Sequence, residues 1–189
     1  DPSREMLDEA RRRLAAEDQD ARSLLRLVEG TGERAQEALG GERFDAVLCH
    51  GVLMYLEDAR PMIRALSSLA RPGGLVSVLT KNASALATRP ALAGRYRDAL
   101  SALGTDRDRG RLGVMTRGDT VGGLSAAFAE AGLAVEQWYG VRVFTDHLED
   151  STPDEHLPEI LELEWEGGKR DPYRSVGRLI HVLGRKKPV

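Results

Sequence analysis

The segment 44–49, with the sequence Phe-Asp-Ala-Val-Leu-Cys, restricts the possible folds of this chain more than any other feature. It has the length of a strand, but it shows too little alternation of polar and apolar residues for a sheet with one face in water. Strands that are buried on both faces occur mainly in parallel sheets, because the helices that connect parallel strands cover both faces. The segment therefore predicts a buried parallel strand in an α/β fold.

Patterns typical of helices and of strands alternate along the chain, which supports this fold class. Apolar residues at helical spacing predict helices at 3–17, 33–39, 56–70, 83–102, 120–131 and 154–166. Short apolar runs predict strands at 24–28, 44–49, 75–80, within 133–145 and at 179–183, and the charged, glycine-rich segment 104–118 is expected to form a loop. The alternation implies right-handed crossovers and a doubly wound, mostly parallel sheet, to which we add an antiparallel edge strand. Residues 1–189 are expected to form a single domain.

Charge and cysteine content exclude some classes of protein. The formal net charge of −3 argues against a large non-specific contact with nucleic acid, although it leaves room for a local basic patch. Cys49 is the single cysteine and is expected to be a buried, reduced thiol. No apolar run reaches the roughly 18 residues of a membrane span, and His147, His156 and His181 lack the spacing of metal ligands. We expect a cytoplasmic protein with no membrane association and no metal.

Three short segments suggest where chemistry takes place. The first is the end of the strand 44–49, where His50 leads into a turn and a helix. Open α/β sheets bind their ligands at the carboxyl ends of parallel strands. The second is the turn 71–74, Arg-Pro-Gly-Gly, which stops a helix and passes directly into a strand. The third is the start of the chain, where Asp1 opens a helix that carries Met6 in its first turn.

With these segments the chain resembles class I S-adenosylmethionine-dependent methyltransferases, which have a Rossmann-like fold. The resemblance implies S-adenosylmethionine as cofactor and places Asp1, Met6 and His50 in the cofactor site. Asp1 would bind the ribose, since a carboxylate accepts hydrogen bonds from both hydroxyls of a vicinal diol.

The resemblance also assigns the loop after the expected strand 24–28 to the adenine of the cofactor. The backbone amide of Gly32 can donate to the ring, and the carboxylate of Glu33 can accept from its exocyclic amine. Glu29 is the alternative position for this acid.

In its carboxyl-terminal half the chain is similar to the tRNA 5-carboxymethoxyuridine methyltransferase family, in the segments 140–148 and 172–182. That family esterifies the carboxylate of a modified wobble uridine. The similarity implies that Lys81, Asn82 and Arg142 hold the acceptor, although Arg142 could instead only pair with an acid. A carboxylate acceptor is already ionised at neutral pH, so we expect no catalytic general base.

Two departures from that family keep other acceptors open. Lys81 stands where the family has an aromatic residue, and Asp106 and Asp108 lie among the arginines of segment 104–118. A small-molecule O- or N-methyltransferase of the same fold is therefore a second hypothesis.

The glycine-rich turn that should follow the first strand of a methyltransferase is missing from the sequence. At that turn the backbone approaches the methionine part of the cofactor so closely that only glycine fits. The segment 30–32, Gly-Thr-Gly, is the nearest candidate, but it follows what we interpret as the third strand. We therefore expect a domain whose first strand and glycine loop lie upstream of these residues. A non-catalytic binding module with a degenerate site is a third hypothesis.

Overall fold

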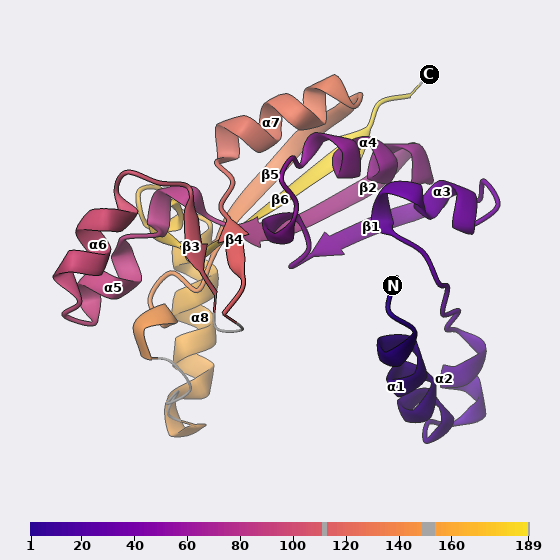
Figure 1. The fold of residues 1–189 in the computed structure, drawn as a ribbon, viewed down its shortest axis with the longest axis horizontal. Coiled ribbons are helices and arrows are strands. Elements are labelled where there is room, and N and C mark those ends of the chain that lie inside the picture. Colours follow the sequence, from indigo (N-terminus) through magenta and orange to yellow (C-terminus); the bar gives the residue numbers. More distant parts are fainter. Residues whose placement is uncertain (111–112, 149–153, 189) are drawn as a thin grey trace.

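A four-stranded sheet forms the centre of the fold, with helices packed on it (Figure 1). The structure is a computed structural model and describes residues 1–110, 113–148 and 154–188. The strands of the sheet are β1 (Phe44–His50), β2 (Ala70–Lys81), β5 (Leu133–Val141) and β6 (Leu179–Lys186), in the spatial order β1-β2-β6-β5. β1 is parallel to β2, and β6 is antiparallel to both β2 and β5. All strands except β6 therefore run in one direction, which confirms the expected mostly parallel α/β sheet.

The position of the antiparallel strand differs from the prediction. We expect it at an edge, but β6 lies between β2 and β5 and forms hydrogen bonds along both of its sides. Ile180 and Val182 of β6 are fully buried, as an inner strand requires. An apolar run shows that a strand is buried, but it does not show which strands become its neighbours, so the sequence alone could not decide this point.

One face of the sheet is covered by α4 (Arg60–Leu69) and α7 (Val121–Glu130), which Figure 1 shows on the same side. α4 forms because Met62, Ile63 and Leu66 recur on one side of a helix. These residues pack with Val76 and Val78 of β2 in the largest hydrophobic cluster. The same cluster contains Phe128 of α7 and the alternate residues Val47 and Cys49 of β1.

The opposite face of the sheet is only partly covered. Leu48 of β1 points to this face and is 62% exposed, so the prediction that the strand 44–49 is buried on both faces is wrong. α8 (Leu157–Gly168) packs on this side of the sheet next to β5. Within residues 1–110, 113–148 and 154–188, no strand pairs with the second edge of β1.

The first 40 residues form helices and loops rather than a strand of the sheet. The helices are α1 (Arg4–Ala15), α2 (Gln19–Ser23), η1 (Gly32–Arg34) and α3 (Ala35–Ala38). The predicted strand 24–28 does not form: Leu24 and Leu25 are exposed, and the segment has only one rung of strand-like pairing, to Asp1. Among the described residues this rung is not extended, because the chain after Asp1 enters α1 at Arg4. An extended segment without a neighbouring ladder gains too few hydrogen bonds to be a strand.

The predicted helix 83–102 is divided into η3 (Ala83–Ala85), α5 (Thr88–Leu92) and α6 (Tyr96–Ala102). Gly94 lies between α5 and α6 at φ +73°, a left-handed conformation that ends a helix. The expected loop 104–118 contains a short ribbon of β3 (Arg107–Arg109) and β4 (Met115–Arg117). Residues 111–112 of that loop lie outside the described residues.

Short 3₁₀ helices complete the fold: η2 (Leu53–Tyr55), η4 (Asp146–Leu148), η5 (Asp154–His156) and η6 (Tyr173–Val176). The predicted strand within 133–145 ends at Val141, because Arg142 has φ +56° and turns the chain away from the sheet. None of the helices in the described part of the chain is long and apolar enough to cross a membrane.

Candidate cofactor and acceptor sites

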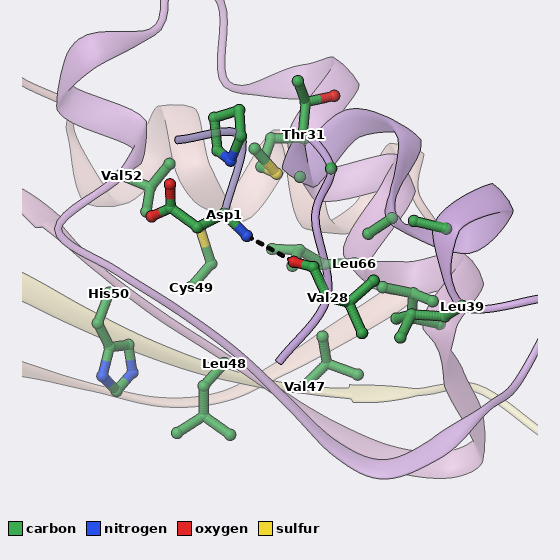
Figure 2. Close-up of a pocket in the computed structure, with 17 residues that line it drawn as sticks. Asp1, Val28, Thr31, Leu39, Val47, Leu48, Cys49, His50, Val52 and Leu66 are labelled. Atoms are coloured by element: carbon green, nitrogen blue, oxygen red, sulfur yellow. Dashed lines mark hydrogen bonds between the residues drawn. The ribbon is translucent and has the colours of Figure 1, made fainter. Parts of the chain in front are cut away.

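A cavity of about 530 Å³ lies beside the end of β1 (Figure 2). Its walls come from the start of the chain, the loop 28–32, α3, α4 and the carboxyl half of β1. Asp1, Gly32 and His50 all line it, although they are far apart in the sequence. The other walls are mostly apolar and include Val28, Leu39, Val47, Val52, Met62 and Leu66. A cavity of this kind suits a flat apolar ring with a few polar substituents.

Asp1 is held in place by its backbone. Its amino group donates to the carbonyl of Val28 (3.0 Å), and its carbonyl accepts from Gly30 (3.1 Å), which is the hydrogen-bond pattern of one residue between parallel strands. One carboxylate oxygen, Oδ1, accepts from the amide of Ser3 (2.8 Å). In Figure 2 the carboxylate points toward Val52 at the mouth of the cavity. An acceptor-only group with such an anchor can receive hydrogen bonds from ligand hydroxyls.

Gly32 packs against the end of the Met62 side chain in α4. A Cβ atom at this position would come within 2.7 Å of Sδ of Met62, so the flexible methionine side chain would have to move if another residue stood here. The two other residues predicted for the cofactor site, Met6 and Glu33, are exposed and are not among the residues that line the cavity.

Burial controls the chemistry of Cys49. This side chain lines the cavity from β1 and is 6% exposed. Burial, followed by the nearby negative charge of Glu33, raises the pKa of the Cys49 thiol to about 11. The residue is therefore a neutral, apolar part of the wall, as predicted, and not a nucleophile at neutral pH.

His50 is the first member of a hydrogen-bonded chain across the sheet. Its Nε2 lies 2.8 Å from Oγ of Ser77 in β2, and the same Oγ lies 2.7 Å from Nε2 of His181 in β6. The two imidazole rings meet edge to face, with 5.3 Å between their centroids. Burial, and secondarily the charge of His50, lowers the pKa of His181, so His181 is neutral at pH 7.

The hydroxyl of Ser77 has one proton, so it can donate to only one of the two histidines, and the histidine tautomers set the direction of each hydrogen bond. The hydrogen bonds that connect His50, Ser77 and His181 could not be predicted from the sequence. The available signal is a serine in the middle of an otherwise apolar strand.

Lys81 and Asn82, which are predicted to hold the acceptor, lie at the carboxyl end of β2 beside a second cavity of about 390 Å³. The ammonium of Lys81 is buried and donates to the carboxylate of Asp108 and to Oγ1 of Thr116 (2.5 Å). The amide of Asn82 donates to the carbonyls of Ser175 (3.0 Å) and Gly177 (2.9 Å). In this structure both side chains use their donors to hold neighbouring loops in place.

Arg142, the third residue predicted to contact the acceptor, follows β5. Its Nε lies 3.5 Å from Oδ1 of Asp146, and Arg178 approaches Oδ2 of the same carboxylate at 3.2 Å. Arg142 and Arg178 also line a small cavity beside α5 and η4. Nε of Arg89 lies 3.9 Å from Oδ2 of Asp146. One carboxylate cannot neutralise three guanidinium groups fully, so positive charge remains at this end of the sheet. Lys81 and Arg142 line different cavities.

Comparisons with known proteins agree with this architecture. Residues 1–76 match a family model described as a methyltransferase domain. Over 143 residues, 75% of this chain, the sequence is 32% identical to the tRNA 5-carboxymethoxyuridine methyltransferases of Escherichia coli K12 and O157:H7. The chain is therefore similar in sequence to S-adenosylmethionine-dependent methyltransferases. The matched region is 54% of each curated relative, so this chain spans about half of their length.

Solved methyltransferase structures have the same fold. The S-adenosylmethionine-dependent methyltransferase from Mesorhizobium loti aligns with 98% of this chain and 78% of its own, with a TM-score of 0.59 and 22% identity. A putative S-adenosylmethionine-dependent methyltransferase from Listeria monocytogenes aligns with 99% of this chain and 78% of its own, with a TM-score of 0.60 and 16% identity. At such identities the similarity concerns the fold of the methyltransferase.

Proposed function

We propose that this protein transfers a methyl group from S-adenosylmethionine to an acceptor, and that the cavity beside β1 holds the adenosine part of the cofactor. The observation that carries the proposal is the convergence of Asp1, Gly32 and His50 on that cavity. Asp1 would accept hydrogen bonds from the ribose, and the apolar walls around Val52 and Met62 would enclose the adenine. When bound, the cofactor supplies a methyl group that its sulfonium has already activated. His50 would bind at the rim, oriented by Ser77.

The methionine part of the cofactor needs a glycine-rich turn, which the sequence of this chain does not contain after a strand. Our proposal therefore includes an additional strand and glycine loop upstream of Asp1. The support for it is the second edge of β1, which has no partner strand among the described residues. A parallel strand at this edge would bring its carboxyl end to the same side of the sheet as His50.

For the acceptor we propose the carboxylate of a modified wobble uridine in tRNA. The curated relatives carry this activity in their names. The structure also gives a physical account of the two departures from their family, since Lys81 and Asp108 form a pair with each other. Because Asp108 is paired with Lys81, its negative charge is neutralised and no longer offsets the arginines of the ribbon β3–β4. Methylation of tRNA would place the protein in the cytoplasm.

A small-molecule acceptor is the second candidate. It is favoured by the internal pairing of the ribbon arginines, because Arg107 binds Glu57 and Arg117 binds Asp119. Arginines that are paired within the protein contribute less to the binding of a polyanion. Methyl incorporation into bulk tRNA and into a metabolite extract, measured side by side, discriminates between the two acceptors.

Isothermal titration calorimetry with S-adenosylmethionine tests the proposal. The variant Asp1→Asn should bind at least tenfold more weakly, because a hydrogen bond to a charged group contributes about 1.5–3 kcal/mol. Asp8→Asn is the matched control, since Asp8 lies on the exposed side of α1 and pairs with Arg11. Absence of binding by a chain that includes the upstream segment would support the degenerate binding module instead. Equal affinities of the Asp1 variant and the unmodified protein would remove Asp1 from the site.

A further inference from the structure

Ser77, in the middle of β2, joins two histidines from the strands on either side. Its hydroxyl lies 2.8 Å from Nε2 of His50 in β1 and 2.7 Å from Nε2 of His181 in β6. Ser77 is 4% exposed and stands in the sequence between two fully buried valines, Val76 and Val78. A buried hydroxyl adds little stability compared with an apolar side chain of the same shape, because its hydrogen bonds replace those that it makes with water. Packing alone therefore does not explain this serine.

The ring of His181 is held in place by aromatic neighbours. The centroid of the Tyr139 ring in β5 lies 6.1 Å from that of His181, and Trp165 of α8 stacks on Tyr139 at 5.7 Å. His181 and Tyr139 both line a cavity of about 610 Å³ under α8. Rings that pack against one another in this way restrict each other's orientation. His181 therefore offers the Ser77 hydroxyl a partner in a fixed position.

His50, at the other end of this network, is open to a ligand. It is the last residue of β1, it is exposed, and it lines the cavity beside β1. Its Nε2 is engaged by Ser77, and its Nδ1 has no hydrogen-bond partner among the described residues. Nδ1 is therefore the ring nitrogen that a ligand is able to bind.

The single proton of the Ser77 hydroxyl connects the tautomers of the two histidines. His181 is neutral at pH 7, because burial, and secondarily the charge of His50, lowers its pKa. If Ser77 donates to His181, it accepts from Nε2–H of His50, and Nδ1 of a neutral His50 is an acceptor. If Ser77 donates to His50, Nδ1 of His50 carries the hydrogen and is a donor. The partner at position 181 thus decides what His50 presents to a ligand.

The first of these arrangements keeps its hydrogen bonds in more states of the protein. An imidazolium donates from both of its nitrogens. A proton taken up by His50 therefore leaves both bonds intact when Ser77 donates to His181. The same proton breaks the bond from Ser77 to His50 in the second arrangement. The first arrangement is favoured for this reason.

We propose that Ser77 and His181 are positioning residues, which hold the ring of His50 so that its Nδ1 accepts a hydrogen bond from a donor group of the ligand in the cavity beside β1. The inference rests on the proposed function for the identity of that ligand, since S-adenosylmethionine carries hydroxyl and ammonium donors. Ser77 and His181 act through His50.

The tautomer of His50 tests the positioning in the chain without cofactor. The chain has four histidines, so the ring nitrogens in a spectrum of ¹⁵N-histidine-labelled protein can be assigned by substitution. At pH 8, where exposed imidazoles are neutral, we expect His50 to carry its hydrogen on Nε2. His181→Phe keeps a ring but cannot accept from Ser77. The hydroxyl should then donate to His50, and the hydrogen of His50 should move to Nδ1.

Further variants identify the cause of this shift. In Ser77→Ala/His181→Phe the hydroxyl is absent, so the hydrogen of His50 should return to Nε2. His181→Gln should keep the tautomer of the unmodified protein, because its amide oxygen can accept from Ser77. His156→Gln is the matched control, since His156 is exposed and lies beside Glu155 in η5. Circular dichroism shows whether each variant is folded.

Cofactor binding measures what the positioning contributes. In a chain that includes the upstream segment, His181→Phe should bind S-adenosylmethionine about fivefold more weakly, because one hydrogen bond to the ligand is lost. His181→Gln and His156→Gln should each change the affinity by less than about twofold.

The outcomes separate this inference from the proposed function. A hydrogen on Nδ1 of His50 in the unmodified protein overturns the positioning, as does an unchanged tautomer or an unchanged affinity in folded His181→Phe. If the unmodified protein with its upstream segment does not bind S-adenosylmethionine at all, the proposed function is wrong. The tautomers then decide the positioning: a shift in His181→Phe that requires Ser77 supports it, and the absence of that shift refutes it.

Discussion

The buried pair of Lys81 and Asp108 leads to an asymmetric prediction. Lys81 is only 3% exposed, whereas Asp108 is 35% exposed. Removing one partner leaves the other charge without its counterion, and the cost depends on how well water can reach the remaining charge. The variant Asp108→Asn leaves a buried ammonium, and the variant Lys81→Met leaves a carboxylate that is already partly in water.

The magnitudes follow from this difference in exposure. A buried charge that loses its partner lowers the free energy of unfolding by about 3–5 kcal/mol. Among the described residues, Thr116 is the hydrogen-bond partner of Lys81 that remains, at 2.5 Å. Lys81→Met replaces the stem with a side chain of similar volume and removes a charge that is costly to bury. We expect it to lower the free energy of unfolding by less than about 1.5 kcal/mol.

Urea denaturation, followed by circular dichroism, measures these differences. The double variant Lys81→Met/Asp108→Asn should recover most of the stability that Asp108→Asn loses, because no charge is then left buried. An aromatic residue at position 81 should likewise be tolerated when position 108 is neutral. A larger loss for Lys81→Met than for Asp108→Asn would refute the reasoning from exposure.

Four further predictions concern the core and the cavities. Glu164→Gln should lower the free energy of unfolding by about 2–4 kcal/mol in urea, because its carboxylate accepts four hydrogen bonds, whereas the exposed Glu162→Gln should change it by less than about 0.5 kcal/mol. Cys49, with its pKa of about 11, should react with Ellman's reagent at pH 8 far more slowly in the folded protein than in urea, and equal rates would contradict its burial. The lowered pKa of His181 means that the unfolded chain binds a proton more readily, so stability should fall as the pH drops below about 6.5, and this dependence should weaken in His181→Phe. Phe128→Ala, at a fully buried position, should cost about 3–5 kcal/mol in the same urea assay.

Much of the fold could be predicted from local patterns. The strands around 44–49, 75–80 and 179–183 and the helices at 56–70 and 120–131 appear with small changes at their ends. Their apolar spacing is strong, and each lies in the core where burial favours it. The segment 24–28 is different, because no strand in the described part of the chain pairs with it. Apolar character alone does not make a strand without a partner backbone.

The candidate site could be predicted in part. The resemblance to methyltransferases was enough to group Asp1, Gly32 and His50, and the structure places them around one cavity. It was not enough for Lys81 and Arg142, which line different cavities and have internal partners. Residue type shows what a side chain is able to bind, but the partners that the fold brings within 3 Å decide whether its donors are free.

The sequence by itself determined the class of fold, because alternating apolar periods of helix and strand allow few other arrangements. It also gave the resemblance to S-adenosylmethionine-dependent methyltransferases, through Asp1, His50 and the turn 71–74. The tertiary structure alone decided that β6 enters the interior of the sheet, that Ser77 connects two histidines 131 positions apart along the chain, and that α8 encloses a second cavity. The physical reason is that apolar periodicity depends on residues close together in the sequence. Strand order, buried pairs and cavities depend on contacts between distant segments, and a local pattern does not show which distant segments will meet.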